Sequence, residues 1–414
     1  MAFAVVFSIG CSESGDSISS NECMVCHDSS TEEGQLKMQA QFGYENSAHL
    51  LGPRTFYPAD VNAGHLTSFH GSNAMYANGN DCSPCHNHEQ FVGIEEVGQS
   101  PIGCFTCHNP HETKDFSLRT TAAVTLSTGT TFDRGSGNIC VACHQSRGTW
   151  AEYEADADTS FPVNQYSRTG PHHGPQGDML AGVNNAALNS TELGGVTALD
   201  YSTLTPKHMS SNSCVSCHMF RVSGGDARIS GNAQLGGHGF YLKAEVHGSM
   251  KELVLSCNAC HTTDDIDGSS RSAAFTKMDR NTTLSYDDNT TDGNLILQEI
   301  KDMEDALVYY FACDYTFGTS GEVPIKAVTG GTLDGCSGLV SSDYIKDYEF
   351  DTSVKNLNMP KAVAKALWNL KFHVEDKSGG VHNPTFAANM LWDACQVIAD
   401  LDVDTCNNGG NTRP

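Results

Sequence analysis

Apolar side chains repeat at helical spacing mainly towards the end of the chain. Steps of three and four residues separate Ile296, Ile300, Met303, Leu307 and Tyr310. Steps of that size place side chains on one face of an α-helix, and such a face is normally buried against another element. The pattern therefore predicts a helix over residues 295–312.

Two further helices are predicted closer to the C-terminus. The first covers residues 360–374 and begins at Pro360, because proline is favoured in the first turn of a helix. The second covers residues 384–401 and also begins at a proline. The pair Gly379-Gly380 separates the two helices, since glycine favours a turn over a continued helix.

Residues 23–261 lack sustained periodicity and are rich in Gly, Ser, Asn and Thr. Such a segment is expected to form loops and short helices. The sequence therefore predicts three parts. Residues 1–20 are a signal-like or lipoprotein-like segment, residues 21–262 form the main functional domain, and residues 263–414 form an acidic, partly helical C-terminal region that folds back onto it.

Charge excludes several classes of partner. The 414 residues include 24 Lys and Arg against 49 Asp and Glu, which gives a formal net charge of -25. A polyanion of this size repels nucleic acid, so we expect no nucleic-acid partner. We also expect no membrane span, because no run approaches the roughly 18–20 apolar residues that a spanning helix needs.

Cysteine and histidine are unusually frequent, with 17 and 18 residues. Six Cys-x-x-Cys pairs occur, and a histidine follows each pair directly; we number them motif 1 to motif 6 in chain order. The paired cysteines are Cys23, Cys26, Cys82, Cys85, Cys104, Cys107, Cys140, Cys143, Cys214, Cys217, Cys257 and Cys260. The histidines that follow them are His27, His86, His108, His144, His218 and His261.

Cys-x-x-Cys-His is the attachment signal of a c-type haem. Two thiols three residues apart can each form a thioether to one vinyl group of the same porphyrin, and the next residue offers its imidazole to the iron. Zinc sites also use Cys-x-x-Cys pairs but need no histidine directly after each pair, and a redox pair would not recur six times. We therefore predict six c-type haems. The expected fold is mostly coil plus short α-helices wrapped round a chain of six haems, with few strands.

Covalent haem implies export. Haem is attached outside the cytoplasmic membrane, so we expect the chain at the cell surface, outside the cell or in the periplasm. A short apolar run ends at Gly10-Cys11, which makes Cys11 a candidate for lipidation and membrane anchoring. The alternative is a plain signal remnant that carries an unpaired cysteine.

Four cysteines near the C-terminus lie outside the motifs. An even number in an exported chain suggests two disulfides, for which three connectivities are possible. Pairing Cys313 with Cys336 and Cys395 with Cys406 closes the shortest loops.

Twelve histidines remain after each motif has taken one, which is twice the number of sixth ligands that six haems need. We therefore predict bis-histidine coordination at most or all haems, and such irons have no open site. The candidate distal ligands are His49, His70, His111, His172, His208, His238 and His382. His173 is a candidate hydrogen-bond partner, and the histidines expected to support ligands or lie at the surface are His65, His88, His247 and His373.

Residues 288–299 resemble an EF-hand calcium loop. Asp288 occupies the first position, Asp292 the fifth and Glu299 the twelfth, and Gly293 provides the required turn. Thr290 stands where such loops carry Asp or Asn. The alternatives are a Ca2+ site and a solvated acidic turn that precedes the helix.

With the segments CFTCHNPH, CVACHQSR, PHHGPQ, CVSCHM, GGHGF and GGVHNPTF, the chain resembles multihaem c-type cytochromes. One similar group is the filament-forming outer-surface cytochromes of metal-reducing bacteria, the cytochrome nanowires. That resemblance implies a stacked chain of haems, a homopolymer, and a distal histidine shared between subunits. His49 is the candidate donor to the next subunit.

The second similar group is the nitrite- and hydroxylamine-processing multihaem enzymes, whose C-terminal helices carry a similar G-V-H-N-P segment. Those nitrite reductases usually attach the catalytic haem through a motif with Lys in place of His, and no such motif occurs here. We therefore predict an electron conduit rather than an enzyme, with other cytochromes or extracellular acceptors as partners. The alternatives are a reductase with one open haem and a periplasmic electron shuttle.

Overall fold

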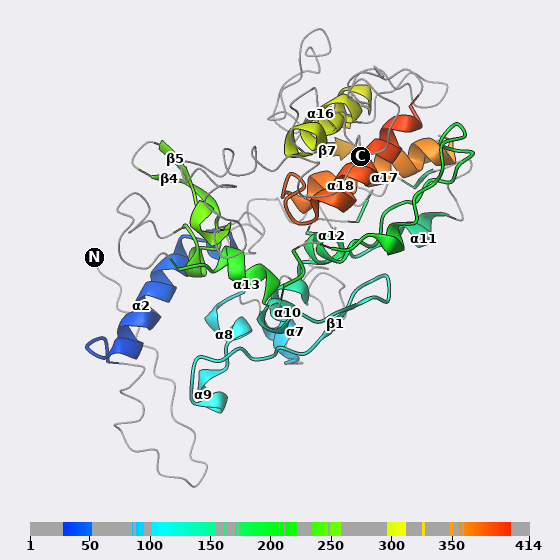
Figure 1. Ribbon diagram of the computed structural model, residues 1–414. Coiled ribbons are helices and arrows are strands. Elements are labelled where there is room, and N and C mark those ends of the chain that lie inside the picture. The colour runs from blue at the N-terminus through cyan, green and yellow to red at the C-terminus, as the bar shows by residue number, and fades with distance from the viewer. Residues whose placement is uncertain are drawn as a thin grey trace.

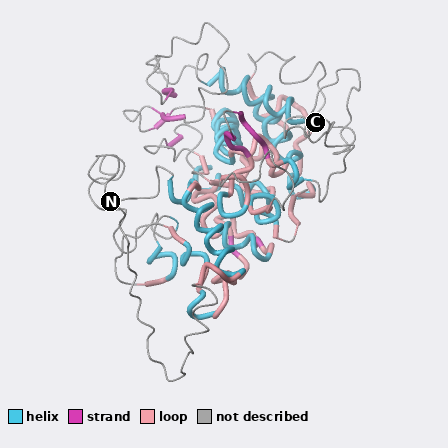
Figure 2. Tube along the Cα trace, turned by 90° about the vertical axis from the view of Figure 1, so that its left-hand side faces the viewer, coloured by secondary structure: helices cyan, strands magenta, loops and turns pink. Residues whose placement is uncertain are grey.

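The structure is a computed structural model of the chain. The residues that it describes are 28–51, 85, 88–94, 102–154, 161–162, 170–171, 174–206, 208–210, 212–221, 234–246, 249–257, 296–311, 325–327, 348–350, 356–357 and 360–398. Helices and loops make up most of this part, and strands are few and short (Figure 2). Whether the chain wraps round haems stays a prediction.

Three longer helices lie at the positions that the apolar repeats predict. They are α16 (Ile296–Tyr309), α17 (Lys361–Asp376) and α18 (Pro384–Gln396), and we call them the helical unit. They lie together in the upper right of Figure 1, where α18 packs against both α16 and α17. α18 ends earlier than the predicted residue 401, and its last turn leads into the β-branched pair Val397-Ile398.

The turn between α17 and α18 is held by local chemistry. Lys377 ends α17 in the left-handed conformation with a φ of 59°. Gly380 has a φ of 90°, and a Cβ there would lie 2.6 Å from Cδ1 of Ile300, so only glycine fits. The Asn383 side chain then accepts a hydrogen bond from the Phe386 N–H and caps α18. The sequence thereby fixes the backbone beside His382.

One apolar core joins the helical unit to the middle of the chain. Its largest fully buried side chains include Trp368, Trp392, Phe372 and Phe386. Two short elements from the middle of the chain reach it, α11 (Trp150–Glu154) and the 3-10 helix η3 (Tyr201–Thr203).

Two polar contacts fix this packing. The Trp368 indole N–H donates to the backbone oxygen of Asn184 at 2.9 Å. The Tyr201 hydroxyl donates to Asp393 Oδ2 at 2.7 Å. The buried indole and hydroxyl groups are therefore satisfied where the two segments meet.

Short helices carry the Cys-x-x-Cys-His motifs and their surroundings. We call the described part of residues 28–257 the motif region. Its α-helices, besides α11, are α2 (Glu32–Glu45), α3 (Ala48–Leu51), α7 (His88–Val92), α8 (Cys104–Cys107), α9 (Pro110–Thr113), α10 (Asn138–Val141), α12 (Gln176–Ala181) and α13 (Ser213–His218). Its 3-10 helices, besides η3, are η2 (Gly135–Gly137), η4 (Gly237–Gly239) and η5 (Val254–Cys257).

The described strands form antiparallel pairs of two. β1 (Val124–Thr125) pairs with β2 (Thr131–Phe132), and β4 (Lys243–Val246) pairs with β5 (Ser249–Glu252). β6 (Ile325–Ala327) pairs with β7 (Tyr348–Phe350), and β3 (Phe161–Pro162) pairs with the distant β8 (Asn356–Leu357). Pairs this short add little independent stability, so packing between helices and loops has to hold the chain.

Candidate haem sites

Motifs 3, 4 and 5 are described in full, and each is built on a short helix. α8 carries Cys104 and Cys107, α10 begins motif 4, and α13 carries motif 5. One helical turn brings thiols three residues apart to the same side. The backbone N–H of His108 donates to the Cys104 carbonyl at 2.9 Å, and the backbone N–H of His144 donates to the Cys140 carbonyl at 2.8 Å. These hydrogen bonds fix the backbone of His108 and His144 relative to the cysteines before them.

Motif 4 lies in contact with two other motifs. The Cys143 thiol hydrogen-bonds Cys85 of motif 2, and the Cys140 thiol hydrogen-bonds Cys214 of motif 5. The described motif cysteines form no disulfide, so their sulfur atoms remain chemically able to form thioethers. Burial also raises the pKa of the Cys107 thiol of motif 3 to about 11, which shows that this sulfur faces the interior.

Each complete motif places its histidine beside a histidine from a distant part of the chain. The ring centres of His108 and His238 are 6.0 Å apart. His144 and His49 are separated by 6.1 Å, and His218 and His382 by 6.2 Å. In every pair one member follows a Cys-x-x-Cys pair and the other is a candidate distal ligand.

This spacing is that of two imidazoles on one iron. A metal ion binds an imidazole nitrogen at about 2 Å, and that nitrogen lies about 1 Å from the ring centre, so two axial histidines have ring centres about 6 Å apart. Rings in direct edge contact reach similar spacings, so the spacing needs independent support from the ring nitrogens. Their hydrogen bonds provide it.

All three motif histidines use Nδ1 for a hydrogen bond to a neutral oxygen. The acceptors are the Ser117 carbonyl at 3.2 Å from His108, the Gln176 side-chain oxygen at 3.1 Å from His144, and the Phe240 carbonyl at 2.9 Å from His218. A histidine that binds a metal usually donates its other ring N–H in this way. Nε2 is therefore the ring nitrogen that each motif histidine would offer to iron, and the residues present fit bis-histidine haems.

Phe240 links the three pairs. Its ring centre lies 4.7 Å from that of His49 and 6.0 Å from that of His238, and its carbonyl accepts the His218 hydrogen bond. Its φ is 64°, a left-handed conformation that is costly for a bulky side chain and tends to occur at functional sites.

Burial keeps two distal histidines neutral. It lowers the pKa of His49 to about 4, and the neighbouring His144 adds to the shift. It lowers the pKa of His238 to about 4 as well, with smaller contributions from His108 and Arg221. Only the neutral imidazole has a lone pair for a metal, so both side chains are in the binding form at neutral pH.

No family model, no curated protein and no solved structure matches this chain. Its function therefore has to be inferred from the residues themselves.

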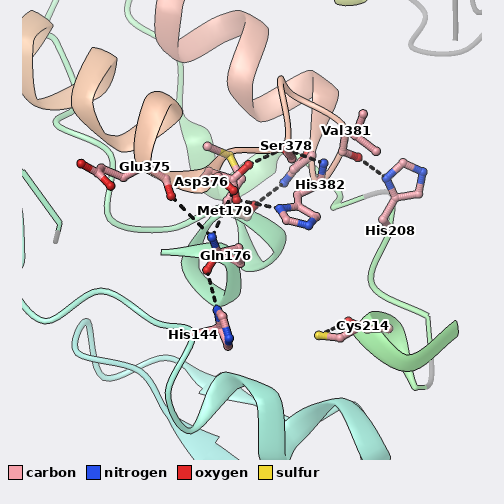
Figure 3. Close-up of polar contacts among 12 residues, drawn as sticks. His144, Gln176, Met179, His208, Cys214, Glu375, Asp376, Ser378, Val381 and His382 are labelled. Atoms are coloured by element: carbon pink, nitrogen blue, oxygen red, sulfur yellow. Dashed lines mark hydrogen bonds and ion pairs between the residues drawn. The ribbon is translucent and has the colours of Figure 1, made fainter. Parts of the chain in front are cut away.

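The turn between α17 and α18 reaches the motifs at two points (Figure 3). The Gln176 amide that accepts from His144 also donates to the Asp376 carbonyl at 3.1 Å. His208 donates from Nδ1 to the Val381 carbonyl at 2.5 Å. The hydrogen-bonding pattern of His208 is that of a metal ligand.

Other predicted residues lie elsewhere. His111 is exposed, and its ring centre lies 5.9 Å from that of Phe105. His88 contacts the Thr106 hydroxyl of motif 3 at 2.9 Å. His373 was expected to support a ligand or lie at the surface, but it is buried and pairs with Glu304 at 2.9 Å. The predicted site residues outside the described part are Cys23, Cys26, His27, His70, Cys82, His86, His172, Cys260 and His261.

His49 has a ring partner within its own chain. It lies on α3, is largely buried, and its ring partner is His144. A side chain in this position fits a ligand for the motif 4 haem of the same subunit. Its donation to a neighbouring subunit stays a prediction.

Two side chains of the site carried no signal in the sequence. Gln176 is an ordinary glutamine at the start of α12, and Asp376 is one of many acidic residues. Gln176 acts through contacts with segments far away along the chain. The contacts of Asp376 with Ser378 and His382 depend on the conformation of the turn after α17, which no sequence pattern specified. Phe240 carried a weak signal, because the glycines that flank His238 indicate an irregular backbone.

Three other predictions touch the described part. Glu299 is buried on α16, whereas Asp288 and Asp292 of the calcium loop lie outside it. Cys395 is in a disulfide, but both predicted pairings involve undescribed cysteines: Cys313, Cys336 and Cys406.

Within the described ranges, no group of three or more His, Cys, Asp or Glu is arranged to hold a metal ion. None of the described helices has both the length and the apolar character that a bilayer crossing requires.

Proposed function

We propose that this chain is a multihaem c-type cytochrome that transfers electrons through bis-histidine haems at the cell surface or in the periplasm. The observation that carries this proposal is the set of three histidine pairs, each joining a motif histidine to a distant one at 6.0–6.2 Å. Chance placement would not give the same partner type and the same spacing at every complete motif.

The protein would hold each cofactor at four points. Two cysteines of a motif would form the thioethers, and the motif histidine and its distant partner would supply the axial nitrogens. A bound c-type haem provides a one-electron Fe(III)/Fe(II) couple. With both axial positions occupied by protein, each described site would exclude substrates from the iron, which favours electron transfer over catalysis.

Contacts between motifs support rapid exchange. Cys143 touches Cys85, and Cys140 touches Cys214. Because thioethers form at the edge of a porphyrin, this contact would place the edges of neighbouring cofactors close together. Motif 4 would then be a junction between motifs 2 and 5 rather than a link in a simple row.

The acidic chain favours low potentials. Its formal charge of -25 stabilises the more positive oxidised state, and bis-histidine ligation acts in the same direction. Assembly into a filament, exchange with other cytochromes and delivery to extracellular acceptors extend the proposal on the resemblance alone.

The direct test is electron paramagnetic resonance of the oxidised protein, with the haem count measured on the same sample. We expect six haems, all ferric and low-spin. A sample without covalent haem would refute the proposal. A high-spin haem in the unmodified protein would indicate an open site and would direct assays to nitrite and hydroxylamine reduction.

A variant tests the pairing itself. His49→Ala should retain six attached haems but convert one haem-equivalent from its bis-histidine signal to a high-spin or changed low-spin signal. His373→Gln is the matched control, because His373 is also buried but contacts Glu304 rather than a motif. If His49→Ala leaves the spectrum unchanged, His144 has another axial partner.

A further inference from the structure

We propose that Asp376 is a positioning residue that lowers the reduction potential of the haem attached at motif 5, acting through His382. The inference rests on the proposed function, because it requires a haem between His218 and His382. It goes further, because it assigns to one buried carboxylate a difference in reduction potential between this haem and its neighbours.

Asp376 is the last residue of α17 and is only 1% exposed. Its Oδ1 accepts a hydrogen bond from His382 Nδ1 at 2.7 Å, and its Oδ2 accepts one from the Ser378 hydroxyl. The Ser378 oxygen in turn accepts from the His382 backbone N–H at 3.2 Å. Figure 3 shows these three side chains converging in the turn. His382 is therefore held by hydrogen bonds at both its imidazole ring and its backbone N–H.

Its neighbours identify the haem that His382 would serve. The ring centre of His382 lies 6.2 Å from that of His218, and this ring contact places His382 at motif 5.

The environment of Asp376 leaves its charge to act on His382. Within the described residues, no lysine or arginine pairs with this carboxylate, and nearby Lys371 pairs with Glu375 instead at 3.2 Å. A ferric haem with two neutral axial histidines carries one more positive charge than the ferrous form. A buried carboxylate hydrogen-bonded to an axial ligand therefore stabilises the ferric form and lowers the potential.

The other axial candidates differ from His382 in this respect. The motif histidines donate to carbonyl or amide oxygens, which are neutral. His49 and His238 have no ring hydrogen bond to another described residue. Among the three complete sites, only motif 5 has a carboxylate behind an axial nitrogen, so its haem should have the lowest potential of the three.

The test is Asp376→Asn in the full haem-loaded protein, followed by a redox titration monitored by electron paramagnetic resonance. Asparagine keeps an oxygen acceptor for His382 but removes the charge. We expect the ferric-to-ferrous ratio of one haem, at a fixed potential, to fall at least tenfold, which is about 59 mV for a one-electron couple. The g-values of the same haem should change, because the axial imidazole becomes less basic.

Glu304→Gln is the matched control. It also removes a partly buried carboxylate that contacts a histidine, but its partner His373 lies beside no described motif. We expect all six potentials to stay unchanged in this variant. Equal shifts in the two variants would mean that overall charge, rather than the His382 contact, sets the potential, and would overturn the proposal.

A second variant covers a failure of Asp376→Asn to fold. Ser378→Ala removes one hydrogen-bond donor to the Asp376 carboxylate and leaves its charge facing His382. The reduction potential of the same haem should therefore fall. Unchanged potentials in either folded variant, with six haems attached, would overturn the role of Asp376 and leave the proposed function intact. Loss of haem from the unmodified protein would instead refute the proposed function.

Discussion

The helical unit and the motif region are stabilised by different kinds of interior. The helical unit buries Trp368, Trp392, Phe372 and Leu391 in one continuous apolar cluster. The motif region has two small apolar clusters of its own, around Phe132 and around Leu253, while described residues of its segment 150–204 pack into the large cluster. Thiols and imidazoles lie in contact between several of its short helices.

Under the proposed function, this difference explains why the motif region would need its haems. Apolar burial contributes about 25 cal/mol for each Å² removed from water, so a chain segment with a small core has little to offset its loss of conformational entropy. Six porphyrins would supply the missing apolar surface to the motif region. The helical unit has enough of its own.

Preventing haem attachment should have the largest effect. In protein produced without haem attachment, we expect the motif region to lose most of its protection against hydrogen exchange, because its polar interior cannot hold it together. The helical unit should keep protected amides. Hydrogen exchange with mass spectrometry on the full chain measures both regions at once, and equal protection with and without haem would refute the comparison.

Truncating a core side chain should give the next largest effect. Trp368→Ala should lower the free energy of unfolding by about 3–5 kcal/mol, because it leaves a cavity beside Trp150. Leu36→Ala is the control, since Leu36 is 38% exposed and its loss should cost less than about 0.5 kcal/mol. Denaturant unfolding followed by circular dichroism measures both values. A similar cost for the two variants would show that the helical unit lacks the tight packing described above.

A smaller, pH-dependent effect is expected where the two regions meet. Burial raises the pKa of Asp178 to about 6, although its Oδ2 accepts a hydrogen bond from the Ser146 N–H at 2.7 Å. Because the folded pKa lies above the ordinary aspartate value of 3.8, the folded state binds the proton more tightly. This contribution to stability is fully present below pH 3.8, the ordinary pKa, and is lost as the pH rises through the folded pKa of about 6.

Asp178→Asn should remove this dependence. Between about pH 4.5 and about pH 7.5, the free energy of unfolding should fall by about 1–3 kcal/mol more in the unmodified protein than in the variant. Other groups titrate alike in both proteins, so the difference isolates Asp178. If the free energies of unfolding of the two proteins change in parallel with pH, the pKa of Asp178 is not raised in the folded state.

The sequence predicted the starts of the three longer helices, because Pro360, Pro384 and the apolar stripe along α16 are local signals. It also identified the histidines of all three pairs as axial candidates, because their number exceeds any ordinary need. It could not match them to one another. His238 pairs with His108 rather than with motif 5, which is nearer in sequence.

The residues that tune the sites were hidden for the same reason. Gln176 and Phe240 act only after the chain has folded, when each meets a histidine from another segment. Asp376 meets His382 only through the conformation of the turn between α17 and α18. Spacing rules describe neighbours along a helix or a motif, and they carry no information about contacts that depend on the packing of distant loops.

Under the proposed function, the pairing of His218 with His382 would set an order of maturation. Closing so long a loop is slow, since the entropic cost precedes any contact that rewards it. All six attachment motifs emerge from synthesis before His382 does. A chain interrupted after motif 6 would then carry every haem but leave one iron with an open face, available to oxygen and other small ligands. The turn that carries His382 would thus serve as the completion step that closes the last reactive site.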